Sequence, residues 1–198
     1  MSEKKAAVLL ADGYEEGESL FLADILRRTG VACDTVSIEE EMVRGCHDMY
    51  VKADRLIKDV DYNEYDMVII PGGMPGAANL AKSEPVLAWV RQFMDENKYV
   101  AAICAGPMVL KEADVSAGRT LTSYPAPKYR DMFADANYVD DNAQMDCMVV
   151  TDGNLITSRG PATTFPFAFR LAEALEGNVE AVKQGMLYNA LCESIKNA

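Results

Sequence analysis

The chain has 198 residues, of which 31 are acidic and 19 are basic, so its formal net charge is −12. Hydrophobic residues make up 49% of the chain and charged residues 25%, a composition typical of globular proteins rather than of disordered or fibrous chains. Because nucleic-acid binders need clustered lysine and arginine, the acidic balance excludes binding to a nucleic-acid backbone, and the length predicts one domain over residues 1–198.

The first half of the chain alternates apolar strands with helical patterns. Residues 5–11 (KAAVLLA) predict a strand, and an apolar stripe over residues 16–29 predicts the helix that follows it. Residues 31–38 alternate like a strand, and the more polar residues 43–57 predict short strands or a hairpin at a sheet edge. Residues 66–70 (DMVII) predict a second buried strand that ends abruptly at a Pro-Gly-Gly turn.

The second half continues the same alternation. Ser83 resembles an N-cap, and it predicts a helix that extends to about Lys98. The next predicted elements are a strand at 99–103, a helix to about residue 112, strands at 120–123, 145–151 and 154–158, and helices at 161–175 and 178–196. The Asp152-Gly153 pair joins the last two strands as a hairpin. Strands that alternate with helices predict a three-layer α/β fold, with a mostly parallel sheet covered on both faces.

No apolar run approaches the length of about 20 residues that crosses a bilayer, so we expect no membrane segment. The first apolar run is also too short for a secretory signal, which favours a cytoplasmic protein. The five cysteines contain no CxxC pair, and the chain has one histidine. We therefore expect reduced thiols and no metal site, and the absence of a G-x-G-x-x-G or P-loop pattern predicts no cofactor.

Three turns after predicted strands are candidates for function, because ligands of open parallel sheets bind at the carboxyl ends of the strands. Residues 13–18 carry three glutamates, residues 71–73 contain two glycines, and residues 103–106 contain a cysteine.

Cys104 follows a strand directly, as the nucleophile of a strand-to-helix elbow does, and Ala102 and Gly106 supply the small side chains that such a turn requires. At the N-terminus of a helix the pKa of the thiol would be lowered. The alternative is a small buried core residue.

The other two turns also have two interpretations each. The N–H of Gly73 could join that of Ala105 in an anion cradle facing the thiol, or residues 71–73 could be an ordinary glycine-rich turn. Glu15, Glu16 and Glu18 could be surface residues that complement a helix dipole, or one of them could lie beside the thiol, where burial would raise its pKa. The spacing does not decide which of the three points inward.

At these residues the sequence resembles the DJ-1/ThiJ/PfpI superfamily, specifically its DJ-1 (deglycase) branch, over nearly the whole chain. The matching segments are residues 11–19 (ADGYEEGES), 65–73 (YDMVIIPGG), 76–80 (GAANL), 101–107 (AAICAGP) and 155–161 (LITSRGP). The resemblance implies a flavodoxin-like sandwich with an oxidation-sensitive cysteine at the elbow, usually as a homodimer. It implies further that Cys104 is the nucleophile, Glu18 the protonated carboxyl beside it, and the amides of Gly73 and Ala105 the anion cradle, to which we add Gly72.

Two positions depart from the pattern of the superfamily. Relatives with peptidase activity place a histidine directly after the cysteine, where this chain has Ala105, so we expect no Cys-His peptidase pair. Some members of the branch have a histidine where this chain has Tyr124, which can donate a hydrogen bond but cannot act as a base at neutral pH. We name Tyr124 and Arg159 as candidate pocket residues, and we expect His47 to be a solvated surface residue without a catalytic role.

The resemblance implies cysteine-dependent handling of reactive dicarbonyls, either as a glutathione-independent glyoxalase or as a protein or nucleotide deglycase. The substrate would be a small reactive aldehyde or a glycated molecule. One alternative is an oxidative-stress sensor or chaperone-like protein that uses oxidation of Cys104. A further alternative follows from the ThiJ name, which is associated with thiamine (thiazole monophosphate) biosynthesis, although the chain shows no phosphate-binding motif.

Overall fold

The computed structural model describes residues 4–140 and 148–197. Its centre is a seven-stranded sheet in the order β10-β11-β7-β6-β1-β2-β5, in which only the β10–β11 pair is antiparallel. The strands of this sheet are β1 (Lys5–Leu10), β2 (Ala32–Ser37), β5 (Arg55–Leu56), β6 (Met67–Ile70), β7 (Tyr99–Ile103), β10 (Val149–Asp152) and β11 (Leu155–Ser158). The predicted α/β fold with a mostly parallel sheet is confirmed.

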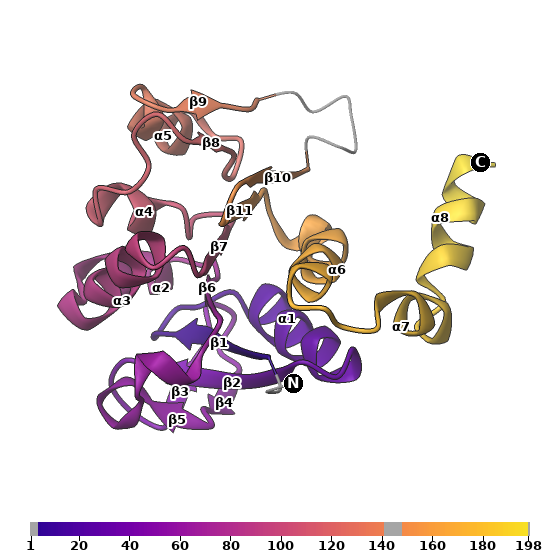
Figure 1. The fold of residues 1–198 in the computed structure, drawn as a ribbon, viewed down its shortest axis with the longest axis horizontal. Helices are drawn as coiled ribbons and strands as arrows, with labels where there is room; N and C mark the ends of the chain where they lie inside the picture. The colour runs from indigo at the N-terminus through magenta and orange to yellow at the C-terminus, as the bar shows by residue number, and fades with distance from the viewer. Residues whose placement is uncertain (1–3, 141–147, 198) are drawn as a thin grey trace.

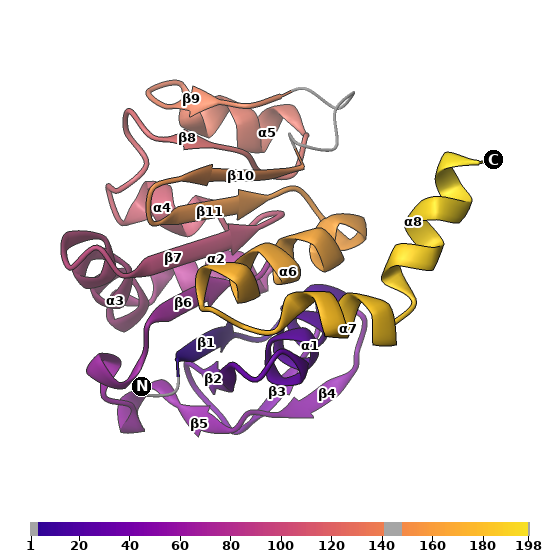
Figure 2. The ribbon, with the colours of Figure 1, turned by 45° about the vertical axis from the view of Figure 1, so that its right-hand side comes forward.

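Helices cover both faces of the sheet, because successive side chains of each central strand point to opposite faces. Val8 and Leu10 of β1 pack in the core on one face, whereas Ala7 and Leu9 pack in the core on the other. Figures 1 and 2 show α1 and α6 on the first face, with α7 beside them, and α2 to α4 on the second. The helices are α1 (Glu16–Arg28), α2 (Gly76–Lys82), α3 (Glu84–Asp95), α4 (Met108–Glu112), α6 (Thr164–Ala174) and α7 (Val179–Gly185).

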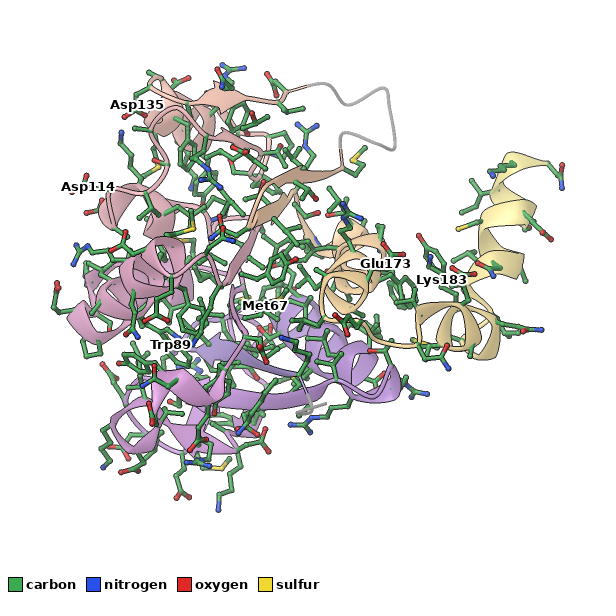
Figure 3. All side chains as sticks on the ribbon, viewed as in Figure 1. Met67, Trp89, Asp114, Asp135, Glu173 and Lys183 are labelled. Carbon is green, nitrogen blue, oxygen red and sulfur yellow. The ribbon has the colours of Figure 1, made fainter. Side chains whose placement is uncertain are left out.

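The helical layers contain both apolar packing and ion pairs. Trp89 of α3 is fully buried on the second face, where its ring stacks on Tyr62 with a centroid distance of 4.4 Å. Met67 packs on the first face (Figure 3). Glu173 of α6 and Lys183 of α7 point toward one another in the same figure and form an ion pair of 3.5 Å. Burial of side chains such as Trp89 supplies most of the stabilisation, because an exposed ion pair contributes at most about 1 kcal/mol.

Several smaller elements surround the main sheet. A hairpin of β3 (Met42–Arg44) and β4 (Tyr50–Lys52) lies before the edge strand β5, as the polar pattern of this region predicts. β8 (Thr120–Leu121) pairs with β9 (Asn137–Tyr138) in a separate two-stranded sheet, so the predicted strand at 120–123 is shorter and lies outside the main sheet. The remaining segments are the helix α5 (Pro127–Arg130) and short 3-10 turns at 57–59, 62–64, 131–133 and 161–163.

Two predicted elements in the last third of the chain differ from the structure. The predicted helix 178–196 is broken into α7 and α8 (Tyr188–Lys196) by Leu187, whose φ of 61° lies in the left-handed region. In both ribbon views α8 extends away from the rest of the molecule. The predicted strand 145–151 is β10, which begins at Val149, and residues 145–147 of that prediction lie outside the described residues. No helix in the described ranges is long and apolar enough to cross a membrane.

Candidate functional site

The three candidate turns meet at one edge of the sheet. They follow β1, β6 and β7, which are neighbours in the sheet and parallel, so their carboxyl ends lie together. Backbone hydrogen bonds tie the first turn to the second: the N–H of Glu15 donates to the carbonyl of Gly72 at 3.0 Å, and the N–H of Gly76 donates to that of Gly13 at 3.1 Å. The sheet topology thus brings together the segments that the sequence singled out.

Cys104 adopts the strained backbone of a strand-to-helix elbow. Its φ is 62°, a conformation that costs a residue with a side chain about 1–3 kcal/mol and is found at functional sites. Two hydrogen bonds stabilise this backbone conformation, one from Cys104 N–H to the carbonyl of Ser158 (3.1 Å) and one from Tyr124 N–H to the carbonyl of Cys104 (2.8 Å). A Cβ on Gly106 would lie 2.4 Å from the carbonyl oxygen of Ile70, which explains why a small residue is needed there.

The short helix α4 begins only at Met108, so Cys104 lies in the turn before the helix rather than in its first turn. The prediction that the pKa of the Cys104 thiol is lowered was also wrong. Burial and the nearby Glu18 carboxylate raise the pKa of the Cys104 thiol, and these effects outweigh hydrogen bonds from the N–H groups of Ala105 and Gly73, which lower it.

Glu18 is the glutamate that reaches the thiol. Its side chain comes from the first turn of α1 and is fully buried, and its Oε2 accepts a hydrogen bond of 2.7 Å from the N–H of Gly72. A Cβ on Gly72 would lie 2.6 Å from the Cβ of Cys104 and 2.7 Å from Oε2 of Glu18, so only glycine allows the two side chains to approach. Glu15, at the same turn, is instead partly exposed, and Glu16 is buried but points to the β3–β4 hairpin.

Burial raises the pKa of Glu18 to about 7, although hydrogen bonds from Gly72 and Cys104 lower it. The effect of Glu18 on the thiol disappears when Glu18 is protonated, because a neutral carboxyl no longer repels the thiolate and can donate a hydrogen bond to it. Protonation of Glu18 therefore removes one of the effects that raise the pKa of the Cys104 thiol.

The remaining predicted site residues differ in their relation to the cysteine. The N–H groups of Gly73 and Ala105 both hydrogen-bond to the thiol. The backbone of Tyr124 is hydrogen-bonded to Cys104, while its side chain is 44% exposed and so is available to a ligand. Arg159 follows the Ser158 carbonyl that binds Cys104 N–H, and its buried side chain pairs with Asp140 at 3.4 Å.

A second group of polar side chains lies beside this site, where the β3–β4 hairpin packs against the start of α1. Glu16 accepts hydrogen bonds from the N–H of His47 (2.7 Å) and contacts its Nδ1 (2.8 Å), and Cys46 Sγ lies 3.1 Å from Glu15 Oε2. Burial raises the pKa of Glu16, but the hydrogen bonds from His47 and Cys46 prevail and hold it at about 2. The prediction of an exposed His47 is confirmed by its side-chain exposure of 63%, but its close pairing with Glu16 was not expected.

Sequence reasoning missed this second group because Glu15 and Cys46 are 31 residues apart. The adjacent cysteine and histidine were the available signal, since the chain has no other histidine. Nothing in the local pattern indicates that their hairpin folds back on the glutamates.

Comparisons with known sequences place the chain in one protein family. The model of the DJ-1/PfpI family matches residues 4–174. Protein dj-1beta of Drosophila melanogaster is 38% identical over 187 residues, which cover 93% of this chain and 97% of that protein. The glutathione-independent glyoxalase DJR-1.2 of Caenorhabditis elegans is 32% identical over 194 residues, which cover 96% of this chain and 97% of that protein.

Solved structures agree with these sequence matches. The crystal structure of Drosophila melanogaster DJ-1beta superposes with a TM-score of 0.87 at 38% identity, covering 93% of this chain and 98% of that chain. The structure of oxidized Toxoplasma gondii DJ-1 superposes with a TM-score of 0.80 at 34% identity, covering 95% of this chain and 98% of that chain.

Proposed function

Because the chain belongs to the DJ-1/PfpI family, we propose that it converts reactive dicarbonyl compounds with Cys104 as nucleophile and without glutathione. The observation that carries the proposal is the strained backbone of Cys104 beside the buried carboxyl of Glu18. The two side chains can approach because Gly72, which lies against both, has no side chain. A similar protein from Caenorhabditis elegans is described as a glutathione-independent glyoxalase. Glycated proteins or nucleotides would present the same aldehyde-derived carbon to the thiol, which extends the proposal to deglycase activity.

The first step is addition of the thiolate to the aldehyde carbon of a dicarbonyl such as methylglyoxal. The sulfur–carbon bond forms, the carbonyl oxygen becomes an oxyanion, and the N–H groups of Gly73 and Ala105 stabilise that charge. Glu18 donates its proton to the oxyanion, which gives a neutral hemithioacetal and a carboxylate. The raised pKa of Glu18, about 7, suits a group that both gives and takes a proton near neutral pH.

The second stage moves one proton between adjacent carbons. The Glu18 carboxylate takes the proton from the hemithioacetal carbon, which leaves an enediolate. Glu18 then returns this proton to the neighbouring carbon, and the hydroxyl proton of the first carbon moves to the oxygen of the second, which leaves a thioester of lactate on Cys104. Water hydrolyses the thioester, which releases lactate and returns the thiol. The overall change is addition of one water to methylglyoxal, so no oxidant, reductant or metal is consumed.

The decisive experiment measures lactate produced from methylglyoxal without glutathione. We expect turnover by the wild type and loss of at least about a hundredfold in both Cys104→Ser and Glu18→Gln, since each removes a group that the chemistry needs. Cys192→Ser, a change of another thiol in α8, should retain full activity. Unchanged lactate production by the Cys104 variant would rule out the proposed mechanism.

A second candidate function, a sensor of oxidative stress, is supported by the same geometry. Cys104 is partly exposed, and amide groups that stabilise an oxyanion would also stabilise the oxygens of a sulfinate. A solved structure of a similar protein, Toxoplasma gondii DJ-1, is described as oxidized. Intact-mass measurement after mild peroxide treatment tests this function: two added oxygens in the wild type and none in Cys104→Ser would support it.

A further inference from the structure

The β3–β4 hairpin and the start of α1 place four side chains with metal-binding atoms in one small volume. They are Glu15, Glu16, Cys46 and His47, and one oxygen, sulfur or nitrogen atom from each lies within 4.8 Å of all the others. Thiolate, imidazole and carboxylate are the three ligand types that zinc binds in proteins. We propose that these four residues form a binding site for a divalent transition metal, with zinc as the best match to the ligand set.

The distances between the ligand atoms fit a four-coordinate site. Cys46 Sγ lies 3.1 Å from Glu15 Oε2, 3.4 Å from Glu16 Oε2 and 3.2 Å from His47 Nδ1. His47 Nδ1 lies 2.8 Å from Glu16 Oε2 and 3.8 Å from Glu15 Oε2. A tetrahedron with ordinary zinc–ligand bond lengths has edges of about 3.4–3.6 Å. Small side-chain rotations would therefore bring all four atoms to bonding distance from one centre.

Hydrogen bonding alone does not account for this packing of atoms. The five contacts at 2.8–3.8 Å share at most two protons, one on the Cys46 thiol and one on Nδ1 of His47. The thiol has three close neighbours and a single proton to donate. A cation at the centre would instead interact favourably with all four atoms at once.

The backbone holds the ligands in place before any metal binds. Oε1 of Glu16 accepts a hydrogen bond of 2.7 Å from the N–H of His47, which leaves Oε2 directed at the sulfur and the imidazole. A Cβ on Gly45 would lie 2.1 Å from Oε1 of Glu16, so glycine at this position makes room for the buried carboxylate. Support of this kind orients ligands and strengthens metal binding.

The hairpin itself is fixed to the helix start. The N–H of Cys46 donates to the carbonyl of Tyr14 at 2.9 Å, and the N–H of Gly13 donates to that of Arg44 at 2.7 Å. Cys46 also borders a cavity of about 310 Å³ together with Asp12, Arg44 and Met74, which gives a metal ion access to the sulfur. The site is thus both preorganised and open.

This inference does not depend on the proposed dicarbonyl activity. The cluster uses neither Cys104 nor Glu18. Gly72 lies between the two groups, since its carbonyl accepts a hydrogen bond from Glu15 N–H and its N–H donates to Glu18. It differs from the expectation of no metal site, which rested on the spacing of cysteines and on the single histidine.

The test uses Co²⁺ as a spectroscopic probe and Zn²⁺ in competition with a chromophoric chelator, on reduced protein first freed of metal. Every protein carries Cys104→Ser, so that the other thiol–carboxyl pair cannot supply the signal. We expect one equivalent of bound Co²⁺, with a thiolate-to-cobalt charge-transfer band in the near ultraviolet and the intense visible bands of four-coordinate cobalt.

Cys46→Ser should abolish the charge-transfer band, and both Cys46→Ser and His47→Ala should weaken zinc binding by at least about tenfold. Cys192→Ser is the matched control and should leave both the band and the affinity unchanged. His47 is 63% exposed, so its substitution tests the site even if loss of Cys46 impairs folding. Absence of stoichiometric binding in the folded protein, or a zinc affinity in both ligand variants equal to that of the Cys104→Ser parent, would overturn the proposal.

Discussion

At the scale of single residues, Gly72 is the position on which the approach of thiol and carboxyl depends. In Gly72→Ala the new Cβ would lie 2.6 Å from the Cβ of Cys104 and 2.7 Å from Oε2 of Glu18, closer than atoms in proteins approach. Because both neighbours belong to buried or strained segments, we expect a loss of about 1–3 kcal/mol in the free energy of unfolding and loss of methylglyoxal turnover. Urea unfolding and the lactate assay measure the two effects.

The control for this substitution is Gly185→Ala, at the end of α7. A Cβ on Gly185 meets no atom within 4 Å, so the same chemical change should leave both stability and turnover within error or slightly raise stability. If Gly72→Ala behaved like Gly185→Ala, the close approach of Cys104 and Glu18 would not depend on the missing side chain.

Glu18 also makes stability depend on pH. Its pKa is raised from the ordinary 4.5 to about 7, so the folded protein binds this proton more tightly than the unfolded chain does. Its protonation therefore stabilises the fold below about pH 4.5, and this contribution is lost as the pH rises to about 7, at a cost of roughly 3 kcal/mol. Relative to Glu18→Gln, the wild type should lose stability over that interval.

The measurement is the free energy of unfolding of both proteins between pH 4.5 and pH 8, with a chelator present to keep the protein free of metal. Glu180→Gln removes an exposed carboxylate of α7 and should leave the pH profile of the wild type unchanged. Parallel profiles for wild type and Glu18→Gln would show that burial does not shift the pKa of Glu18.

At the scale of elements, the break between α7 and α8 depends on one residue in an unfavourable conformation. Leu187 has a φ of 61° and is 70% exposed, so replacing it by glycine relieves backbone strain and removes little packing. We expect Leu187→Gly to stabilise α8 by up to about 1 kcal/mol. Leu191→Gly, the same change at an exposed leucine within α8, should destabilise the helix by about 1 kcal/mol.

Amide hydrogen exchange of α8 is the suitable readout, because it reports local opening of a helix that extends from the rest of the molecule. Slower exchange in Leu187→Gly and faster exchange in Leu191→Gly are expected. Faster exchange in both variants would mean that the Leu187 side chain stabilises the junction more than its backbone strain costs.

The elements also show which parts of the structure are predictable from sequence. β1, β6 and β7 are continuous apolar runs, and their predicted ranges differ from the observed ones by a single residue at most. The turns after them could be identified because parallel neighbours place their carboxyl ends together. The break at Leu187 was missed because apolar periodicity continues through it, and Ser83 occupies the expected N-cap of α3 but forms no side-chain capping bond.

The site was predictable to a similar degree and for similar reasons. The spacing of Cys104 and Gly106 after a strand predicts the elbow from the local sequence. The choice of Glu18 among three glutamates depended instead on resemblance to the family. The direction of the thiol pKa could not be predicted, since it depends on burial and on a carboxyl 86 residues away in the chain. The contact of Cys46 with Glu15 joins residues 31 positions apart, and local periodicity carries no information on it either.

At the scale of the whole molecule, aromatic and exposed apolar side chains gather where α1, α6 and α8 meet. Phe21 of α1 lies 4.8 Å from Phe165 of α6, whose ring stacks at 6.1 Å on Tyr188 of α8. Next to this row of aromatic rings, α8 exposes Leu191 and Ile195. Extended apolar patches of this kind mark protein interfaces, and we propose that this face forms the homodimer implied by the family.

Light scattering should then give twice the chain mass of 21.7 kDa at micromolar concentration. Leu191→Asp should weaken the dimer by at least about a hundredfold, because burial of an unpaired carboxylate costs several kcal/mol. Ala88→Asp introduces the same charge on the exposed side of α3, on the opposite face of the sheet, and should leave the dimer intact. The two variants change net charge equally, so dissociation by Leu191→Asp alone cannot come from general repulsion between acidic chains. A 21.7 kDa wild type, or an equal loss of dimer in both variants, would contradict the assignment of this face.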